Sequence, residues 1–560
     1  MYFFTVLLAA ALVLLAVSAA RACTTMGAGR LATADGSVLV SHSCDGLYDP
    51  RVRVIRGGTH DPDEKLPIYR VMCHADQPGR RLRLGGYIPQ ASRTLNYFQI
   101  AYPFMNEKQV IIGEFTWRGR PELASPDGLF YIENLEAVAL ARCSTARDAV
   151  HLMGQLAESY GYADGGETLV VGDPREAWVF EIIGAGSDWK KGCGRVGAHW
   201  AARRIPDDEF FVGANRSRLG VLDFDDESIM VGSDITALPK ARGWWKDGEP
   251  FDYSHIFNPE AYGYAFYASR REWRVLNLVA PSQNFPVISC HEAYPFSVKP
   301  DHKLTVEDLM KIYSDHLEGT DYDLTKGLAA GPFGCPVRYF TPPETRPKGR
   351  RTDDWERSVA LYRCSYSFVA QCRGWLPDAV GGVLWFGEGA PDTTVYVPIY
   401  CGAEELPKQW SDFRTHAFDR ESAWWPFVIV HNWAQLRWNA MYPVICERRE
   451  QYAKKFSIAQ PAFENEMARL AADGRGPEIP ARATAQTCDA MNEVFSGWWN
   501  FAFELMGRFH DGGIMTPQGT MTAPGYPTWW LESVGFGDTA ERDRAWTDAQ
   551  ISGRWSGISL

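Results

Sequence analysis

The sequence predicts a layered α+β fold. Strand-like segments come first, two helix-like segments follow them, and further strands come after. A doubly wound fold would alternate strand and helix regularly, and neither GxGxxG nor GxxxxGK(S/T) follows a strand here. The 560 residues are 46% hydrophobic, which is enough to bury a large core and excludes a disordered chain.

The first 22 residues are predicted to be a signal peptide. They form an apolar run without charge before Arg21, and Ala20-Arg21-Ala22 is a small-x-small cleavage site. Cleavage would leave Cys23 as the first residue. Two alternatives stay open: an uncleaved membrane anchor, or lipidation of Cys23, for which Arg21 is a poor fit.

No later segment reaches eighteen apolar residues without a charge, so we expect no stable membrane insertion after leader cleavage. A cleaved leader places the protein in the secretory pathway, as a secreted, periplasmic or lysosome-like protein.

The elements of the core follow in chain order. Asp35-Gly36 is a tight-turn signal between short apolar stretches, and it predicts a hairpin that begins at Cys23. Apolar spacing predicts helices over 131–142 and 146–160, the second capped by Ser144 or Thr145. Strands are predicted over 109–113, 168–171, 177–183, 366–369 and 382–386. The polar, proline-bearing segment 341–354 is predicted to be an exposed loop.

From about Ala423 the chain becomes rich in tryptophan and helical, with helices expected over 456–472 and 490–507. We therefore expect a core over 23–422 and a helical C-terminal extension over 423–560. The 21 tryptophans also suggest a secreted ligand-binding protein with aromatic platforms, although most of these rings are expected to pack in the core.

Charge and motif content exclude several partners. A formal net charge of -12 without a basic stripe argues against nucleic acid. The twelve cysteines contain no CxxC pair and the histidines no HExxH motif, so we expect no metal and no cofactor. Some of the other eleven cysteines could form disulfides in an oxidising compartment, and self-association into a homo-oligomer stays open.

An N-terminal Cys23 would combine a nucleophile and a base in one residue. Its α-amine has a pKa near 8, so it can take the thiol proton at neutral pH and later protonate a leaving amine. This combination suits acyl transfer through a thioester. The alternative is a structural cysteine that happens to follow the cleavage site.

The residues around Cys23 resemble the start of the C69 dipeptidase family, which belongs to the N-terminal nucleophile hydrolases. The resemblance begins with Cys23-Thr24-Thr25, Asp35-Gly36-Ser37 and Ser41-His42-Ser43-Cys44-Asp45, and it covers nearly the whole chain after the leader. Further segments that carry it are Asn106-Glu107-Lys108, Ile112-Gly113-Glu114, Gly172-Asp173-Pro174, Trp200 to Asp208, Ala330 to Gly334 and Trp375-Leu376-Pro377-Asp378.

The resemblance implies a four-layer αββα sandwich, with Cys23 at the start of a central strand, and the hydrolysis of dipeptides or short peptides. Related enzymes open N-acyl, bile-salt or ceramide amides, so a non-peptide amide hydrolase is the alternative within enzymes. A secreted or lipid-anchored binding protein is the alternative outside them.

The resemblance also implies roles for individual residues. An Arg and an Asp that orient the thiol and the α-amine align with His42 and Asp45, and His42 departs from the arginine pattern. Asn215 aligns with an oxyanion-holding asparagine, although Asn215-Arg216-Ser217 is also the only N-glycosylation sequon of the chain. A family arginine downstream falls on Arg271 or Arg274.

Two residues are predicted to bind the peptide substrate. Glu114 follows a strand in the region that lines the pocket in relatives, and its carboxylate is expected to pair with the free α-amine of a dipeptide. Asn106 is the second candidate for substrate binding.

Overall fold

The computed structural model describes residues 23–70, 72–74, 82–260, 265–339, 356–516 and 518–535. The predicted leader and the predicted loop 341–354 lie outside these residues. The six-stranded sheet consists of β11 (Phe210–Gly213), β1 (Thr24–Ala28), β2 (Val38–Asp45), β15 (Cys364–Cys372), β16 (Gly382–Glu388) and β17 (Val397–Tyr400), in that order. The five-stranded sheet consists of β13 (Ile229–Val231), β10 (Ala198–Ile205), β9 (Ala177–Gly184), β8 (Gly166–Gly172) and β7 (Ile111–Trp117).

All pairings within these two sheets are antiparallel, and four small two-stranded sheets accompany them. The small sheets are β3 (Arg53–Ile55) with β6 (Tyr97–Gln99), β4 (Lys65–Arg70) with β5 (Arg83–Pro89), β12 (Val221–Leu222) with β14 (Phe251–Asp252), and β18 (Ile514–Met515) with β19 (Met521–Thr522).

The two large sheets pack face to face, with β1 and β2 in contact with β7 and β8. A Cβ atom at Gly113 would lie 3.0 Å from Cγ2 of Thr25 and 3.1 Å from the carbonyl oxygen of Ser41. Glycine at this position therefore allows the sheets to approach closely. The carboxylate of Glu114, the next residue of β7, lies 3.2 Å from Nε2 of His42 on β2.

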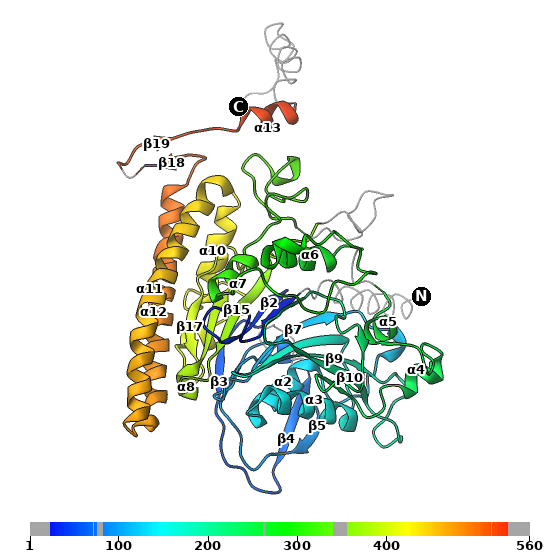
Figure 1. Cartoon of the computed structure of the whole chain (residues 1–560). Coiled ribbons are helices and arrows are strands. Elements are labelled where there is room, and N and C mark those ends of the chain that lie inside the picture. Colours follow the sequence, from blue (N-terminus) through cyan, green and yellow to red (C-terminus); the bar gives the residue numbers. More distant parts are fainter. Residues whose placement is uncertain are drawn as a thin grey trace, which may run out of the picture.

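Helices cover the outer faces of both sheets (Figure 1). α2 (Ile132–Arg142) and α3 (Ala146–Tyr160) pack on each other, and α3 lies on β8, β9 and β10 through a stripe of small and apolar residues. α6 (Ser269–Val279), α7 (Val306–Tyr313) and α12 (Ile479–Arg508) contact β11, β15 and β17 of the other sheet. The fold is therefore α+β, as the sequence predicts.

The remaining helices lie in connections and in the C-terminal part. They are α4 (Ala237–Arg242), α5 (Tyr253–Phe257), α8 (Asp378–Gly381), α9 (Lys408–Ser411), α10 (Trp424–Ala434), α11 (Trp438–Ala472) and α13 (Thr528–Ser533). The long helices α11 and α12 run side by side along one flank (Figure 1).

Several predicted elements need correction at their ends. α11 begins eighteen residues before the predicted position 456 and continues through Pro443 and Pro461. β7 extends to Trp117, so Glu114 lies inside the strand and does not follow it. The helix over 146–160 is confirmed, and Oγ1 of Thr145 accepts the capping hydrogen bond from the backbone N–H of Asp148.

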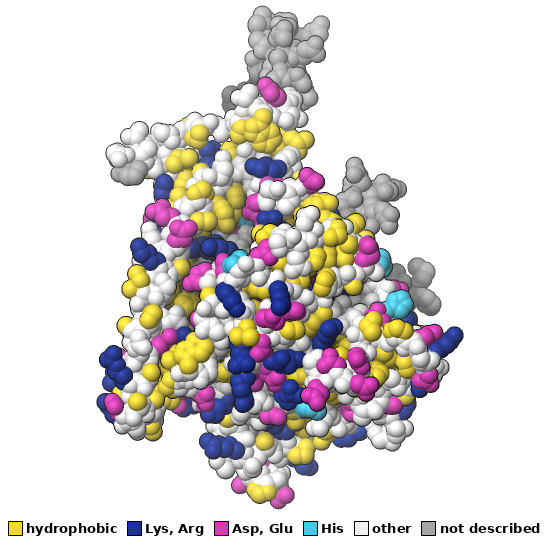
Figure 2. Space-filling model, viewed as in Figure 1, with side chains coloured by type: hydrophobic (Ala, Val, Ile, Leu, Met, Phe, Trp, Pro, Cys, Tyr) yellow, Lys and Arg dark blue, Asp and Glu magenta, His cyan; other side chains and the backbone are white. Residues whose placement is uncertain are grey.

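Three expectations from the sequence concern the surface charge, the crossing of a membrane and the formation of disulfide bonds. Basic and acidic side chains are interspersed on the face shown in Figure 2. Among the described residues, no helix has the length and apolar character that a membrane crossing requires. All twelve cysteines lie within the described residues, and no disulfide bond joins any two of them.

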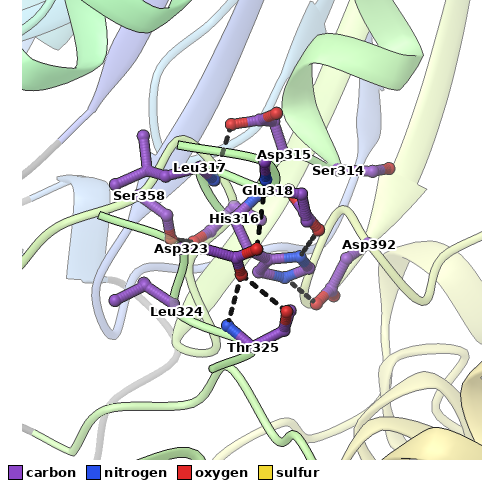
Figure 3. Close-up of polar contacts among 12 residues, drawn as sticks. Ser314, Asp315, His316, Leu317, Glu318, Asp323, Leu324, Thr325, Ser358 and Asp392 are labelled. Carbon is purple, nitrogen blue, oxygen red and sulfur yellow. Dashed lines mark hydrogen bonds and ion pairs between the residues drawn. The ribbon is translucent and has the colours of Figure 1, made fainter. Parts of the chain in front are cut away.

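The buried side chain of His316 lies between two acidic side chains, Glu318 and Asp392 (Figure 3). His316 follows α7, and its two ring nitrogens each lie 2.9 Å from a carboxylate oxygen, Oε1 of Glu318 and Oδ2 of Asp392. Oδ1 of Asp392 lies 3.5 Å from Nδ1 of His431 on α10. Burial opposes protonation of His316, but the hydrogen bonds to Asp392 and Glu318 outweigh it and raise its pKa to about 9.

We expect this group of side chains to make the protein less stable at alkaline pH. The folded pKa of about 9 lies above the value of about 6.5 for an unfolded histidine, so the stabilisation is complete below pH 6.5 and disappears as the pH rises through 9. Between these pH values the free energy of unfolding should fall by roughly 2–3 kcal/mol. Urea denaturation at several pH values measures this fall, and in His316→Gln the same pH range should produce a clearly smaller one.

Candidate active site

Cys23 lies immediately before β1, and its side chain is buried, with 1% of its surface exposed. Thr24 pairs with Ser43 across the hairpin, so Cys23 continues the register opposite Cys44. The sulfur atoms of these two cysteines lie within 4.8 Å of each other and of ligand atoms of His42 and Glu114. The hairpin and β7 together therefore gather four reactive side chains.

Burial raises the pKa of the Cys23 thiol well above its usual value, and the neighbouring Cys44 and Glu114 raise it further. The thiol is therefore protonated at neutral pH. A thiol in this environment reacts as a nucleophile only when a base removes its proton.

Arg271 on α6 anchors the backbone of Cys23. Its Nη1 donates to the carbonyl oxygen of Cys23 and to Oγ1 of Thr24, both at 2.9 Å. Its Nη2 donates to Oδ1 of Asn215 at 2.6 Å. Burial, and then the charge of Arg357, lower the pKa of Arg271 to about 10, so the guanidinium keeps its charge at neutral pH.

Asn215 follows β11 with a positive φ of 53° and is fully buried. Its Oδ1 must face Arg271, because a guanidinium only donates hydrogen bonds. Its Nδ2 consequently points the other way and donates to the carbonyl oxygen of Thr116 at 2.7 Å. A glycan on this nitrogen would not fit the folded chain, so the structure favours an internal role for Asn215 over the sequon.

Asp45 ends β2 and forms a buried ion pair with Arg357, in which Nη2 donates to Oδ2. Burial raises the pKa of Asp45, and the charges of Arg357 and Arg271 offset part of this effect. Oδ1 of Asp45 accepts no N–H or O–H hydrogen bond from the described residues. Arg357 thus holds one carboxylate oxygen of Asp45, and the thiol of Cys364 is a further hydrogen-bond donor beside this carboxylate.

Within the cluster of four side chains formed by Cys23, His42, Cys44 and Glu114, the imidazole of His42 and the carboxylate of Glu114 face each other. Nε2 of His42 lies 3.2 Å from Oε1 of Glu114, and both side chains are fully buried. Glu136 on α2 is a further buried carboxyl: burial raises its pKa well above the usual value, and the charges of Glu114 and Glu133 add to this. Acidic groups therefore line one side of the cluster.

Two predicted candidates lie elsewhere. Nδ2 of Asn106 donates to the carbonyl oxygens of Leu140 and Cys143, and its Oδ1 accepts from the backbone N–H groups of Lys108 and Val110. Because the amide makes these four backbone hydrogen bonds, it stabilises a loop, and its contact with substrate stays a prediction. Arg274, the alternative to Arg271, pairs with Asp315.

The sequence reasoning missed Arg357, Cys44 and Glu136. Alternate residues of a strand share a face, so the position of Cys44 two residues after His42 was a usable signal. Arg357 follows a polar segment and gives no local sign that its charge is buried. Glu136 lies on α2, and only the packing of this helix on α3 and β6 in the folded chain buries its side chain.

Comparison with known proteins places this chain among peptidases. Residues 22–454 match the model of peptidase family C69. A probable dipeptidase B of Lactococcus lactis is 27% identical over 420 residues, which are 72% of this chain and 79% of that protein. Dipeptidase A of Lactobacillus helveticus is 25% identical over 512 residues, which are 88% of this chain and 96% of that protein.

Proposed function

Because this chain belongs to peptidase family C69, we propose that it is a cysteine dipeptidase whose nucleophile is the thiol of Cys23. The observation that carries the proposal is that Arg271 donates hydrogen bonds both to the carbonyl oxygen of Cys23 and to Oδ1 of Asn215, with Asp45 at the end of the paired strand. The two sheets with helices on their outer faces support an αββα arrangement of the N-terminal nucleophile type.

The first step is attack on the peptide carbonyl. After removal of residues 1–22, the free α-amine of Cys23 takes the thiol proton, and the sulfur bonds to the carbonyl carbon of the substrate. We place the resulting ammonium near Oδ1 of Asp45, which would fix its direction. The ammonium then returns the proton to the leaving amine, the C–N bond breaks, and water hydrolyses the remaining thioester.

Negative charge develops on the carbonyl oxygen during this step. We propose that the Nδ2 amide of Asn215 donates to this oxygen, because Arg271 fixes the orientation of the amide. One such donor is worth about 3 kcal/mol in other hydrolases. Arg271 contributes by positioning both Asn215 and the carbonyl group of Cys23.

Two measurements test the proposed function directly. Intact mass and N-terminal sequencing should show a mature chain that begins at Cys23, and this chain should hydrolyse unblocked dipeptides. A mature chain that begins elsewhere would refute the mechanism, since residue 23 would then have no free amine. A diacylglyceryl mass on Cys23 would instead support the lipid-anchored binding protein.

The acidic side of the cluster suggests how a dipeptide is recognised. We propose that Glu114, with Glu136 behind it, receives the free α-ammonium group of the substrate. A cation placed between buried carboxylates would offset their mutual repulsion.

We expect Glu114→Gln to lower kcat/KM for unblocked dipeptides by about 30-fold or more, because the substrate ammonium loses a buried charged partner. The same substitution should affect N-acylated dipeptides much less, since they carry no ammonium group. Steady-state kinetics with both substrate types measures the difference. An equal loss of kcat/KM for both substrate types would show that Glu114 does not bind the α-ammonium group of the substrate.

A further inference from the structure

We propose that the nucleophile is also a ligand of an inhibitory binding site for a thiophilic divalent cation such as Zn²⁺. The four ligands would be the side chains of Cys23, His42, Cys44 and Glu114. Binding of the metal follows from these side chains alone, whereas inhibition rests on the proposed catalytic role of Cys23.

The spacing of the four side chains fits a tetrahedral site. One ligand atom of each residue lies within 4.8 Å of the others. Zinc bonds of about 2.0 Å to nitrogen or oxygen and 2.3 Å to sulfur place tetrahedral ligand atoms roughly 3.3 to 3.8 Å apart. At the largest separation of 4.8 Å, each atom has to move by about 0.6–0.9 Å toward the centre, which a change of side-chain torsion can supply.

The chemistry of the ligands also fits zinc. Two thiolates, an imidazole and a carboxylate form a donor set that zinc accepts in proteins. Nδ1 of His42 and Oε2 of Glu114 lack a hydrogen-bond partner among the described residues, and Nε2 of His42 and Oε1 of Glu114 face only each other, at 3.2 Å, although all four atoms are buried. A cation between them would satisfy these buried polar atoms, which otherwise carry a desolvation cost.

Metal binding and hydrolysis exclude each other at this site. Zn²⁺ forms bonds to the sulfurs of Cys23 and Cys44, and each thiol releases its proton to solvent. The lone pair with which Cys23 would attack a carbonyl is then shared with the metal. A peptide that reacts with Cys23 has to reach its sulfur, so a hydrated ion has access by the same route.

The ligands come from the residue before β1, from β2 and from β7, so no short sequence motif predicts the site. The absence of HExxH excluded one kind of zinc site and left this one open. Cys44 distinguishes the metal site from the hydrolytic one, because the proposed mechanism assigns it no step.

The test uses Co²⁺ as a spectroscopic substitute for Zn²⁺ in the mature enzyme, without substrate and with a thiol-free reductant. We expect a thiolate-to-cobalt charge-transfer band that saturates at about one Co²⁺ per chain and disappears when Zn²⁺ is added. Cys44→Ser should weaken binding at least about tenfold, because one of the two thiolates is lost. Cys372→Ser, which removes another buried thiol on β15, should bind as the unsubstituted enzyme does.

Glu114→Gln provides a second ligand variant in case Cys44→Ser does not fold, and it should also weaken binding. Absence of the charge-transfer band, or equal affinity in the ligand variants and in Cys372→Ser, would overturn the proposal. Because the band is read without substrate, its outcome is independent of whether the enzyme hydrolyses dipeptides.

Discussion

Mature Cys23→Ala should lose the hydrolysis of dipeptides by about 10⁴- to 10⁶-fold while it keeps its fold. The alanine removes the sulfur that would form the thioester in the proposed mechanism but keeps a free α-amine at residue 23. Cys23→Ser should also be strongly impaired, because a hydroxyl is far harder to deprotonate than a thiol. Steady-state rates on an unblocked dipeptide, measured after intact mass has verified residue 23 as the first, give the result.

Cys372→Ala is the matched control for this prediction. Cys372 is also a buried free thiol in the six-stranded sheet, and its Sγ donates to the carbonyl oxygen of Gln109. This variant should hydrolyse dipeptides as the unsubstituted enzyme does. Hydrolysis by Cys23→Ala at the unsubstituted rate would show that another residue is the nucleophile.

Local patterns predicted most of the core because the local signals agree with the tertiary fold there. The turn at Asp35-Gly36, the cap at Thr145 and the apolar stripe of α3 each specify one conformation. The start of α11 was missed because Pro443 lies inside the helix and makes the sequence look like a boundary. Packing on α10 and α12 maintains that helix despite its prolines.

The candidate site was predicted in part because some of its residues lie close together in the sequence. Cys23 and Asp45 belong to one hairpin, so a short motif locates them relative to each other. Asn215 and Arg271 were placed by resemblance, and in the structure Arg271 donates one hydrogen bond to the backbone of Cys23 and another to Asn215. The partner of Asp45 could not be predicted, because Arg357 is 312 residues away in the sequence and only the tertiary fold joins them.

Arg357→Met should destabilise the protein by about 3–5 kcal/mol and abolish hydrolysis. The substitution leaves Asp45 buried without its cation, and an unpaired buried charge costs far more than the ion pair contributes. The double variant Asp45→Asn/Arg357→Met removes both charges and should recover much of the lost stability. Urea denaturation of the single and double variants measures the two free energies of unfolding.

Hydrolysis separates the structural role of Asp45 from the proposed catalytic one. The double variant should remain inactive even though it is stable, because the neutral amide that replaces the carboxylate cannot hold the α-ammonium of Cys23 with a charge. Arg373→Met is the matched control: it breaks the Arg373–Glu464 pair, whose nitrogen–oxygen distances are 2.7 and 2.8 Å, between β15 and α11. It should lose stability but keep the hydrolysis rate of its folded fraction. If the double variant were both stable and active, Asp45 would serve the fold alone and the α-amine would need another partner.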